Sequence, residues 1–167
     1  MALIKSISGI RGTIGGKPGE NLTPLDIVKF TAAFATSLGS HTNKNTIVIG
    51  RDGRISGKMV SELCANTLMG CGFNVIDLGL TTTPTVEIAV KEERADGGII
   101  LTASHNPMEW NALKLLNNNG EFLNAEAGEK VLSIAENEKF NFVSVDKIGV
   151  YKKDDSYLQK HIEAVLD

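Results

Sequence analysis

Only two cysteines, Cys64 and Cys71, occur among the 167 residues. They lie seven positions apart on one predicted helix, without Cys-x-x-Cys spacing or neighbouring metal-ligand side chains, which disfavours both a disulfide framework and a cysteine metal site. We expect two small core side chains and a reducing, cytoplasmic compartment. No apolar run approaches the ~20 residues of a membrane span, and the N-terminus lacks a signal-peptide pattern. The sequence therefore predicts no membrane partner.

Aromatic residues make up only 5% of the sequence, and the basic residues of 1–60 never form a run. The formal net charge is -3, yet residues 1–60 carry eight basic and three acidic side chains, and the remainder is acidic. A basic half of this kind fits either a nucleic-acid surface or a site for a small anion. Because the basic residues stand singly among glycine-rich loops, the sequence favours a compact anionic ligand and predicts no nucleic-acid partner.

Apolar periodicity predicts helices and strands that alternate along the chain. Four helices are expected to begin at capping residues, which are Thr23, Ser56, Thr83 and Asn124. Met59 belongs to the expected inward face of the second helix. Strands are expected at 46–50, 73–79, 97–101 and 111–116, the last turning back in a hairpin. The alternation predicts a three-layer α/β/α sandwich with a mixed, mostly parallel sheet.

The end of the sequence differs from this pattern. A charged stretch covers 151–155, and a helical pattern that starts at Ser156 stops at Asp167 without a capping signal. We therefore expect one domain over residues 1–150, followed at 151–167 by a linker and the truncated start of a second domain.

Three loops are expected at one edge of the sheet. Ligands of open α/β sheets gather at the carboxyl ends of the strands, which the segments 50–57, 79–85 and 102–107 follow. The glycine spacing in 50–57 does not fit a P-loop, and 9–16 does not fit a dinucleotide-binding turn. Ser104 lacks the flanking glycines of a nucleophile elbow, which disfavours a serine hydrolase.

Each candidate side chain also has a purely structural interpretation. The segment "TASHNP" at 102–107 can be a turn stabilised by local hydrogen bonds. Arg51 and Asp52 can form a local ion pair, Arg11 can be a solvated loop residue, and Lys114 can lie on the exposed side of a strand. The residue patterns alone leave these alternatives open.

Four segments resemble, in order and spacing, the first domain of the α-D-phosphohexomutases, a family that includes phosphoglucomutase/phosphomannomutase and phosphoglucosamine mutase. They are "SGIRG" (8–12), "GRDGRISG" (50–57), "GLTTTPT" (79–85) and "LTASHNPMEWNALKL" (101–115). The resemblance implies an enzyme that interconverts hexose 1-phosphate and hexose 6-phosphate through a phosphoserine and a bisphosphorylated sugar. It leaves open whether the sugar is glucose, mannose or glucosamine.

The resemblance also implies roles for individual residues. Ser104 would carry the phosphoryl group, whose oxygen would contact a Mg²⁺ ion, a hard cation that prefers oxygen ligands. Lys114 matches a lysine expected to assist proton transfer, and His105 matches the histidine after the phosphoserine; either can be the main proton-transfer group. The residues expected to bind substrate or phosphate are Arg11, Asn106 and Arg51.

The sequence lacks other parts of the family's active site. These are the D-G-D-G-D metal loop of the second domain, the sugar-recognition loop of the third and the phosphate clamp of the fourth. Residues 1–167 alone are therefore expected to fold but to be inactive, with the other domains of a longer chain as partners. The alternative interpretation is a non-catalytic phosphate- or nucleotide-binding α/β module.

Overall fold

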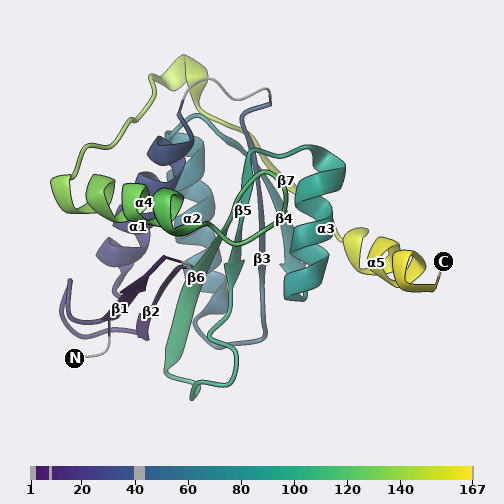
Figure 1. The fold of residues 1–167 in the computed structure, drawn as a ribbon, viewed down its shortest axis with the longest axis horizontal. Coiled ribbons are helices and arrows are strands. Elements are labelled where there is room, and N and C mark those ends of the chain that lie inside the picture. The colour runs from purple at the N-terminus through teal and green to yellow at the C-terminus, as the bar shows by residue number, and fades with distance from the viewer. Residues whose placement is uncertain (1–2, 8, 40–43, 167) are drawn as a thin grey trace.

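The computed structural model describes residues 3–7, 9–39 and 44–166. Ser8 of the first motif and Asp167 of the C-terminal helical pattern lie outside these residues. The described strands form one sheet in the order β1-β2-β6-β5-β3-β4-β7 (Figure 1). Their bounds are β1 Leu3–Ser6, β2 Gly9–Thr13, β3 Thr46–Arg51, β4 Asn74–Leu80, β5 Gly97–Leu101, β6 Trp110–Leu116 and β7 Tyr151–Lys153.

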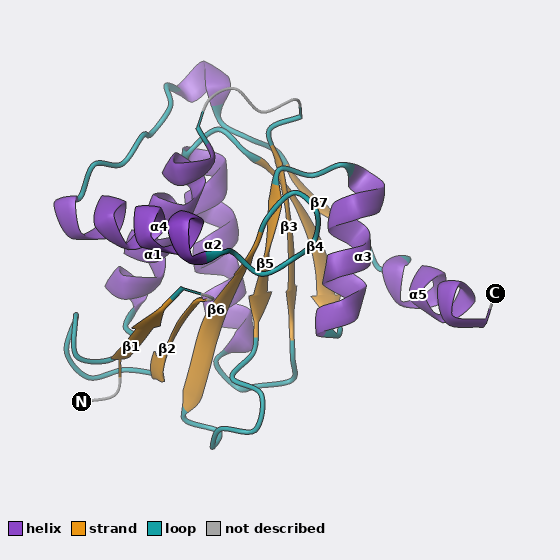
Figure 2. Cartoon of the chain, in the orientation of Figure 1, coloured by secondary structure: helices purple, strands orange, loops and turns teal. Residues whose placement is uncertain are grey.

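The sheet is mixed. β3 pairs in parallel with β4 and β5, and β4 pairs in parallel with β7. β6 is antiparallel to both β5 and β2, and β1 is antiparallel to β2, so only β1 and β6 run against the other strands. Together with helices on both faces of the sheet, this confirms the expected α/β/α architecture (Figure 2).

Helices cover the two faces unequally. The helices are α1 Pro24–Leu38, α2 Gly57–Gly70, α3 Thr83–Glu93, α4 Ala125–Asn137 and α5 Tyr157–Leu166, with a short 3-10 turn at Val145–Lys147. One hydrophobic core joins α1, α2 and α4 to the sheet, and a second joins α3 and Tyr157 to the opposite face (Figure 1). Neighbouring strand residues divide between them: Ile99 belongs to the first core and Ile100 to the second. This alternation follows from the twofold repeat of a strand.

The structure confirms two of the four predicted helix caps. Thr23 and Asn124 cap α1 and α4 as expected, and Thr23 forms a reciprocal capping box with Asp26. The cap of α3 is Thr82 instead of Thr83, because Thr83 and Pro84 are already helical. Ser56 precedes α2, but its hydroxyl makes no cap hydrogen bond and accepts one from Asn111 at 2.9 Å instead.

Other differences from the prediction lie at the edges of the sheet. Met59 is 37% exposed, so its place on the inward face of α2 was wrong. The expected hairpin after β6 reduces to one bridge between Leu116 and Phe122. Tyr151–Lys153, expected in a linker, forms strand β7 at one edge, while β1 and β2 were not predicted. Within the described residues, no helix is both long and apolar enough to cross a membrane.

Both cysteines are buried free thiols. Burial raises the pKa of Cys64 from 9.0 to about 12 and that of Cys71 from 9.0 to about 11. A raised pKa means that the folded state keeps its proton where the unfolded state loses it. The stability that the protonated thiols allow is therefore complete below pH 9.0. It is lost as the pH rises through the pKa values that the thiols have in the folded state.

We expect the free energy of unfolding to fall steadily from pH 9 to pH 11, because each buried thiol then lowers it by up to about 1.4 kcal/mol per pH unit. Urea unfolding followed by circular dichroism across this range would measure the fall. A Cys71→Ala variant, which has lost one of the two thiols, should show a shallower fall. A free energy of unfolding with no pH dependence here would contradict the expectation.

The loop after β5 contains a residue in an unfavourable backbone conformation. Ser104 has a φ of 54°, in the left-handed region, where a residue with a Cβ atom pays roughly 1–2 kcal/mol. Glycine has no Cβ and adopts this conformation without that cost. The fold therefore holds a serine where glycine would be the more stable choice.

Replacing Ser104 separates the effect of the Cβ atom from that of the hydroxyl. We expect Ser104→Gly to be more stable than Ser104→Ala by about 1 kcal/mol, since only the alanine variant retains the strained Cβ. Both variants lack the hydroxyl, so the comparison is matched, and urea unfolding at pH 7 measures it. Equal stability of the two variants would show that the loop relaxes away from the left-handed conformation.

Candidate functional site

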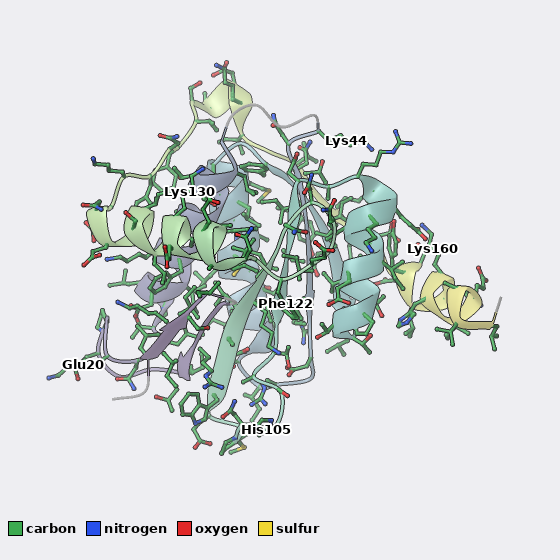
Figure 3. The ribbon with its side chains drawn as sticks, in the orientation of Figure 1. Glu20, Lys44, His105, Phe122, Lys130 and Lys160 are labelled. Atoms are coloured by element: carbon green, nitrogen blue, oxygen red, sulfur yellow. The ribbon has the colours of Figure 1, made fainter. Side chains whose placement is uncertain are left out.

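The loop between β5 and β6 presents Ser104 at the carboxyl edge of the sheet. Ser104 and His105 are exposed, and within the described residues the Ser104 hydroxyl makes no hydrogen bond. Figure 3 shows His105 at the tip of this loop. The loop is internally hydrogen-bonded, since both the backbone N–H and the side-chain amide of Asn106 donate to the Ala103 carbonyl. A hydrogen-bonded backbone thus carries an exposed hydroxyl that has no hydrogen-bond partner among the described residues.

A second loop, which follows β3, is hydrogen-bonded to the serine loop through Arg54. The Arg54 guanidinium donates to the Ser104 and Asn106 carbonyls through Nη2, at 2.8 and 2.9 Å, and to the Pro107 and Trp110 carbonyls through Nη1, at 2.8 and 3.0 Å. Nε of Arg54 pairs with the Asp52 carboxylate at 3.2 Å. The side chain of Arg54 is only 10% exposed, so it acts inside the protein and not toward solvent.

The Asp52 carboxylate links Arg54 to the start of the serine loop. Its Oδ2 accepts a hydrogen bond of 2.6 Å from the Thr102 hydroxyl, and the same hydroxyl accepts one of 3.1 Å from the Ser104 backbone N–H. Oδ1 accepts from the backbone N–H of Arg54 at 3.1 Å. Asp52 therefore forms its ion pair with Arg54, and the local pair expected between Arg51 and Asp52 is absent among the described ion pairs.

Arg51 lies apart from this network. Among the described residues, its guanidinium donates to the Asp52 backbone carbonyl alone, at 3.3 Å. It lines a different cavity of about 400 Å³, beside β4 and β7, together with Thr81, Lys153 and Leu158. The structure therefore does not bring Arg51 into hydrogen-bonding contact with the serine loop.

Arg11 and Lys114 come together on neighbouring strands. Arg11 lies in β2 opposite Ala112 of β6, and Lys114 follows two residues along on the same face. Gly9, opposite Lys114, has a φ of 149°, and a Cβ there would collide with the Leu113 carbonyl oxygen, so the close strand approach requires glycine. The two cations line one cavity of about 310 Å³. Arg11 is thus an exposed strand residue and not a loop residue.

Within the described residues, Lys114 makes no hydrogen bond or ion pair with the serine loop. It pairs with Ile100 of β5, two residues before Thr102, where that loop begins. Its ammonium nitrogen lies 6.0 Å from the centroid of the Phe122 ring, a cation–π contact. The site therefore has two parts: a rigid serine loop at the edge of the sheet, and a cationic strip of Arg11 and Lys114 on the adjoining face.

The described residues contain no group of three or more His, Cys, Asp or Glu side chains that could hold a metal ion. The nearest carboxylate in the network, that of Asp52, is already bound by Arg54 and Thr102.

Arg54 and Thr102 are the residues that sequence reasoning missed. Both stand inside recognised motifs, and the Asp-x-Arg spacing of Asp52 and Arg54 places the two side chains on one short turn. That spacing signals an ion pair. The four carbonyl acceptors of Arg54 come from a loop fifty residues away, which no local pattern indicates.

Comparison with known proteins agrees with this geometry. A family model described as phosphoglucomutase/phosphomannomutase, alpha/beta/alpha domain I, matches residues 3–142. A phosphoglucomutase/phosphomannomutase of Thermococcus kodakarensis is 37% identical over 157 residues, which cover 92% of this chain and 34% of that protein. A phosphoglucosamine mutase of Helicobacter pylori is 34% identical over 158 residues, which cover 92% of this chain and 36% of that protein.

The fold is also found in solved structures. The crystal structure of a phosphoglucomutase/phosphomannomutase family protein from Burkholderia thailandensis superposes with a TM-score of 0.78 at 22% identity, over 98% of this chain and 36% of that one. The chain spans about a third of the length of the curated relatives it matches. The match to domain I covers most of the chain and includes both parts of the site, so this chain belongs to the phosphoglucomutase/phosphomannomutase family.

Proposed function

We propose that this chain is the serine-bearing first domain of a phosphohexomutase, with Ser104 as the residue that carries the transferred phosphoryl group. The observation that supports this most strongly is the state of Ser104, whose exposed hydroxyl is free of hydrogen bonds within the described residues although its backbone is fixed on both sides. Phosphoryl transfer depends mainly on positioning and charge neutralisation. A fixed, accessible oxygen is the feature that such a reaction needs from the protein.

The proposed reaction has two balanced transfers. In the first, the bond between phosphorus and the Ser104 oxygen breaks while phosphorus bonds to a hydroxyl oxygen of a hexose monophosphate; that hydroxyl gives its proton to a base, and the Ser104 oxygen takes up a proton. In the second, the Ser104 hydroxyl gives up its proton as its oxygen takes the other phosphoryl group from the bisphosphorylated sugar, and the sugar oxygen that is released takes up a proton. The products are the isomeric hexose phosphate and the original phosphoserine.

Two side chains are candidates for the proton acceptor. His105 follows Ser104 on the exposed loop, so it is next to the transferring group. Lys114 lines the same cavity as Arg11, so it would lie beside an anionic substrate bound there. For Lys114 to act, its side chain would have to leave the Phe122 ring and extend toward the edge of the sheet.

The remaining candidates would bind phosphate. Arg11 is exposed and makes no side-chain hydrogen bond within the described residues, so its guanidinium is available to an anionic substrate. The Asn106 amide is engaged by the Ala103 carbonyl and would act mainly by shaping the loop. Arg51, in its separate cavity with Lys153, would contact a more distant part of the ligand or of the protein.

We further propose Mg²⁺ as the cation bound to phosphorylated Ser104, because phosphate oxygens suit a hard cation. This chain would supply a phosphate oxygen and, within its described residues, no carboxylate cluster. The other ligands would come from further domains of a longer chain, which would begin beyond β7 and Tyr157. The exposed apolar side chains of α5, which include Leu158 and Ile162, fit the start of such a domain.

The central test removes the proposed phosphoryl carrier. In the complete enzyme, Ser104→Ala should abolish both the phosphate detected on the 101–115 segment by peptide mass spectrometry and the turnover of glucose 1-phosphate, because no other oxygen can take the phosphoryl group. Ser133→Ala, at an exposed position on α4, is the matched control and should retain both. A fully active Ser104→Ala enzyme would rule out Ser104 as the phosphoryl carrier. A native enzyme with neither phosphate on this segment nor turnover would favour a non-catalytic phosphate-binding module.

A second test concerns the division of the site between domains. Residues 1–167 expressed alone should show no turnover of glucose 1-phosphate above the rate without protein, because the chain matches only domain I of relatives about three times as long. The complete enzyme, assayed in parallel with Mg²⁺ present, is the positive control. Measurable turnover by the isolated residues would mean that the described site is sufficient by itself.

A further inference from the structure

Arg54 has no hydrogen-bond donor left for a ligand. A guanidinium carries five N–H donors, and the five acceptors in this structure are the Asp52 carboxylate and four backbone carbonyls of the serine loop. A buried guanidinium is costly unless it is paired and hydrogen-bonded. Arg54, at 10% exposed, satisfies both conditions within the protein, so its role lies in organising the loop.

Both backbone polar groups of Ser104, its carbonyl and its N–H, are hydrogen-bonded to other side chains. Its carbonyl accepts from Arg54 at 2.8 Å, and its N–H donates to the Thr102 hydroxyl at 3.1 Å. Both partners meet at one atom, Oδ2 of Asp52, which accepts from Thr102 at 2.6 Å and from Arg54 at 3.2 Å. A shared carboxylate oxygen means that the two restraints cannot shift independently.

These restraints act where the backbone is strained. Ser104 is the described residue of this loop with a positive φ, and the left-handed conformation disfavours any residue that has a Cβ atom. Residues in such conformations persist when the surrounding contacts over-determine them. Arg54 supplies such contacts, because it binds the carbonyls of Ser104 and Asn106, on either side of His105. These hydrogen bonds orient the peptide groups that follow Ser104.

We propose that Arg54, together with Asp52 and Thr102, is the positioning unit of the phosphoryl-transfer reaction. It holds Ser104 in its left-handed conformation so that the hydroxyl, and the phosphoryl group it would carry, face the substrate while the backbone stays fixed. The proposal rests on the proposed function of Ser104 for its catalytic consequence, but the restraint itself is a property of the folded chain. Arg54 is thus not a catalytic residue, since it touches neither substrate nor reacting atoms.

This role differs in its kinetic signature from that of a phosphate-binding arginine. Loss of a substrate contact raises KM, whereas loss of alignment lowers kcat. A displacement of about 1 Å at a reacting group can lower the rate by about 100-fold. Replacing Arg54 should therefore lower kcat with KM unchanged, whereas replacing Arg11 should raise KM.

The first experiment measures the restraint without any activity assay. In Arg54→Lys, the ammonium keeps the charge but cannot bind four carbonyls at once. We expect the backbone ¹⁵N order parameter of Ser104 in residues 1–167 to be about 0.85 in the native protein and below about 0.6 in the variant. Arg94→Lys, at the opposite edge of the sheet, is the matched control and should leave Ser104 rigid.

The second experiment measures the consequence in the complete enzyme, where Arg54→Lys should lower kcat by about 100-fold with KM for glucose 1-phosphate unchanged. If Arg54→Lys does not fold, Thr102→Val removes the acceptor of the Ser104 N–H without removing a charge, and should loosen Ser104 in the same measurement. A rigid Ser104 in the variants, or a changed KM with normal kcat, would overturn the positioning role. A loosened Ser104 in an enzyme that carries no phosphoserine would instead overturn the proposed function and leave the restraint established.

Discussion

The ion pair between Arg54 and Asp52 is the contact on which the carboxyl edge of this sheet depends. It joins two loops that leave neighbouring strands. Because the pair is partly buried, each charge needs its partner and its hydrogen bonds. Those hydrogen bonds go to the backbone of the serine loop and to Thr102, so satisfying the charges also fixes the loop. The requirement that a buried charge be neutralised thereby becomes a constraint on the position of Ser104.

The sheet positions the second part of the site by a different constraint, which is strand register. Arg11 and Lys114 share a face because β2 and β6 pair with Gly9 opposite Lys114. A shift of β2 by one residue would turn Arg11 toward the opposite face, against the core formed by α1 and α4, and away from Lys114. α3 covers only the other half of their face, so the cavity beside β2 and β6 remains open to a ligand. The cationic strip and the serine loop are therefore positioned independently, the first by backbone pairing and the second by a side-chain network.

Sequence patterns predicted the parts of the fold that depend on local physics. Apolar periodicity and caps placed the helices at Thr23 and Asn124, and the buried strands β3, β4 and β5 followed from short apolar runs. Patterns failed where a distant partner decides the outcome. The Ser56 hydroxyl bonds to Asn111 instead of capping α2, and Tyr151–Lys153 becomes a strand only because β4 leaves an edge free. Arg54 was missed for the same reason, since its acceptors are backbone carbonyls, which are identical in every sequence.

Strain and restraint at Ser104 are two aspects of one arrangement. A glycine would relieve the left-handed backbone, but it would have no oxygen to offer, so a serine there requires compensating contacts from elsewhere. The compensation comes from donors and acceptors that bind only the backbone, which leaves the side-chain oxygen without a partner among the described residues. A hydroxyl that helped to stabilise its own loop would have to break that bond before reacting. Because the restraint lies in the main chain, the loop can remain rigid while the oxygen gains and loses a charged group.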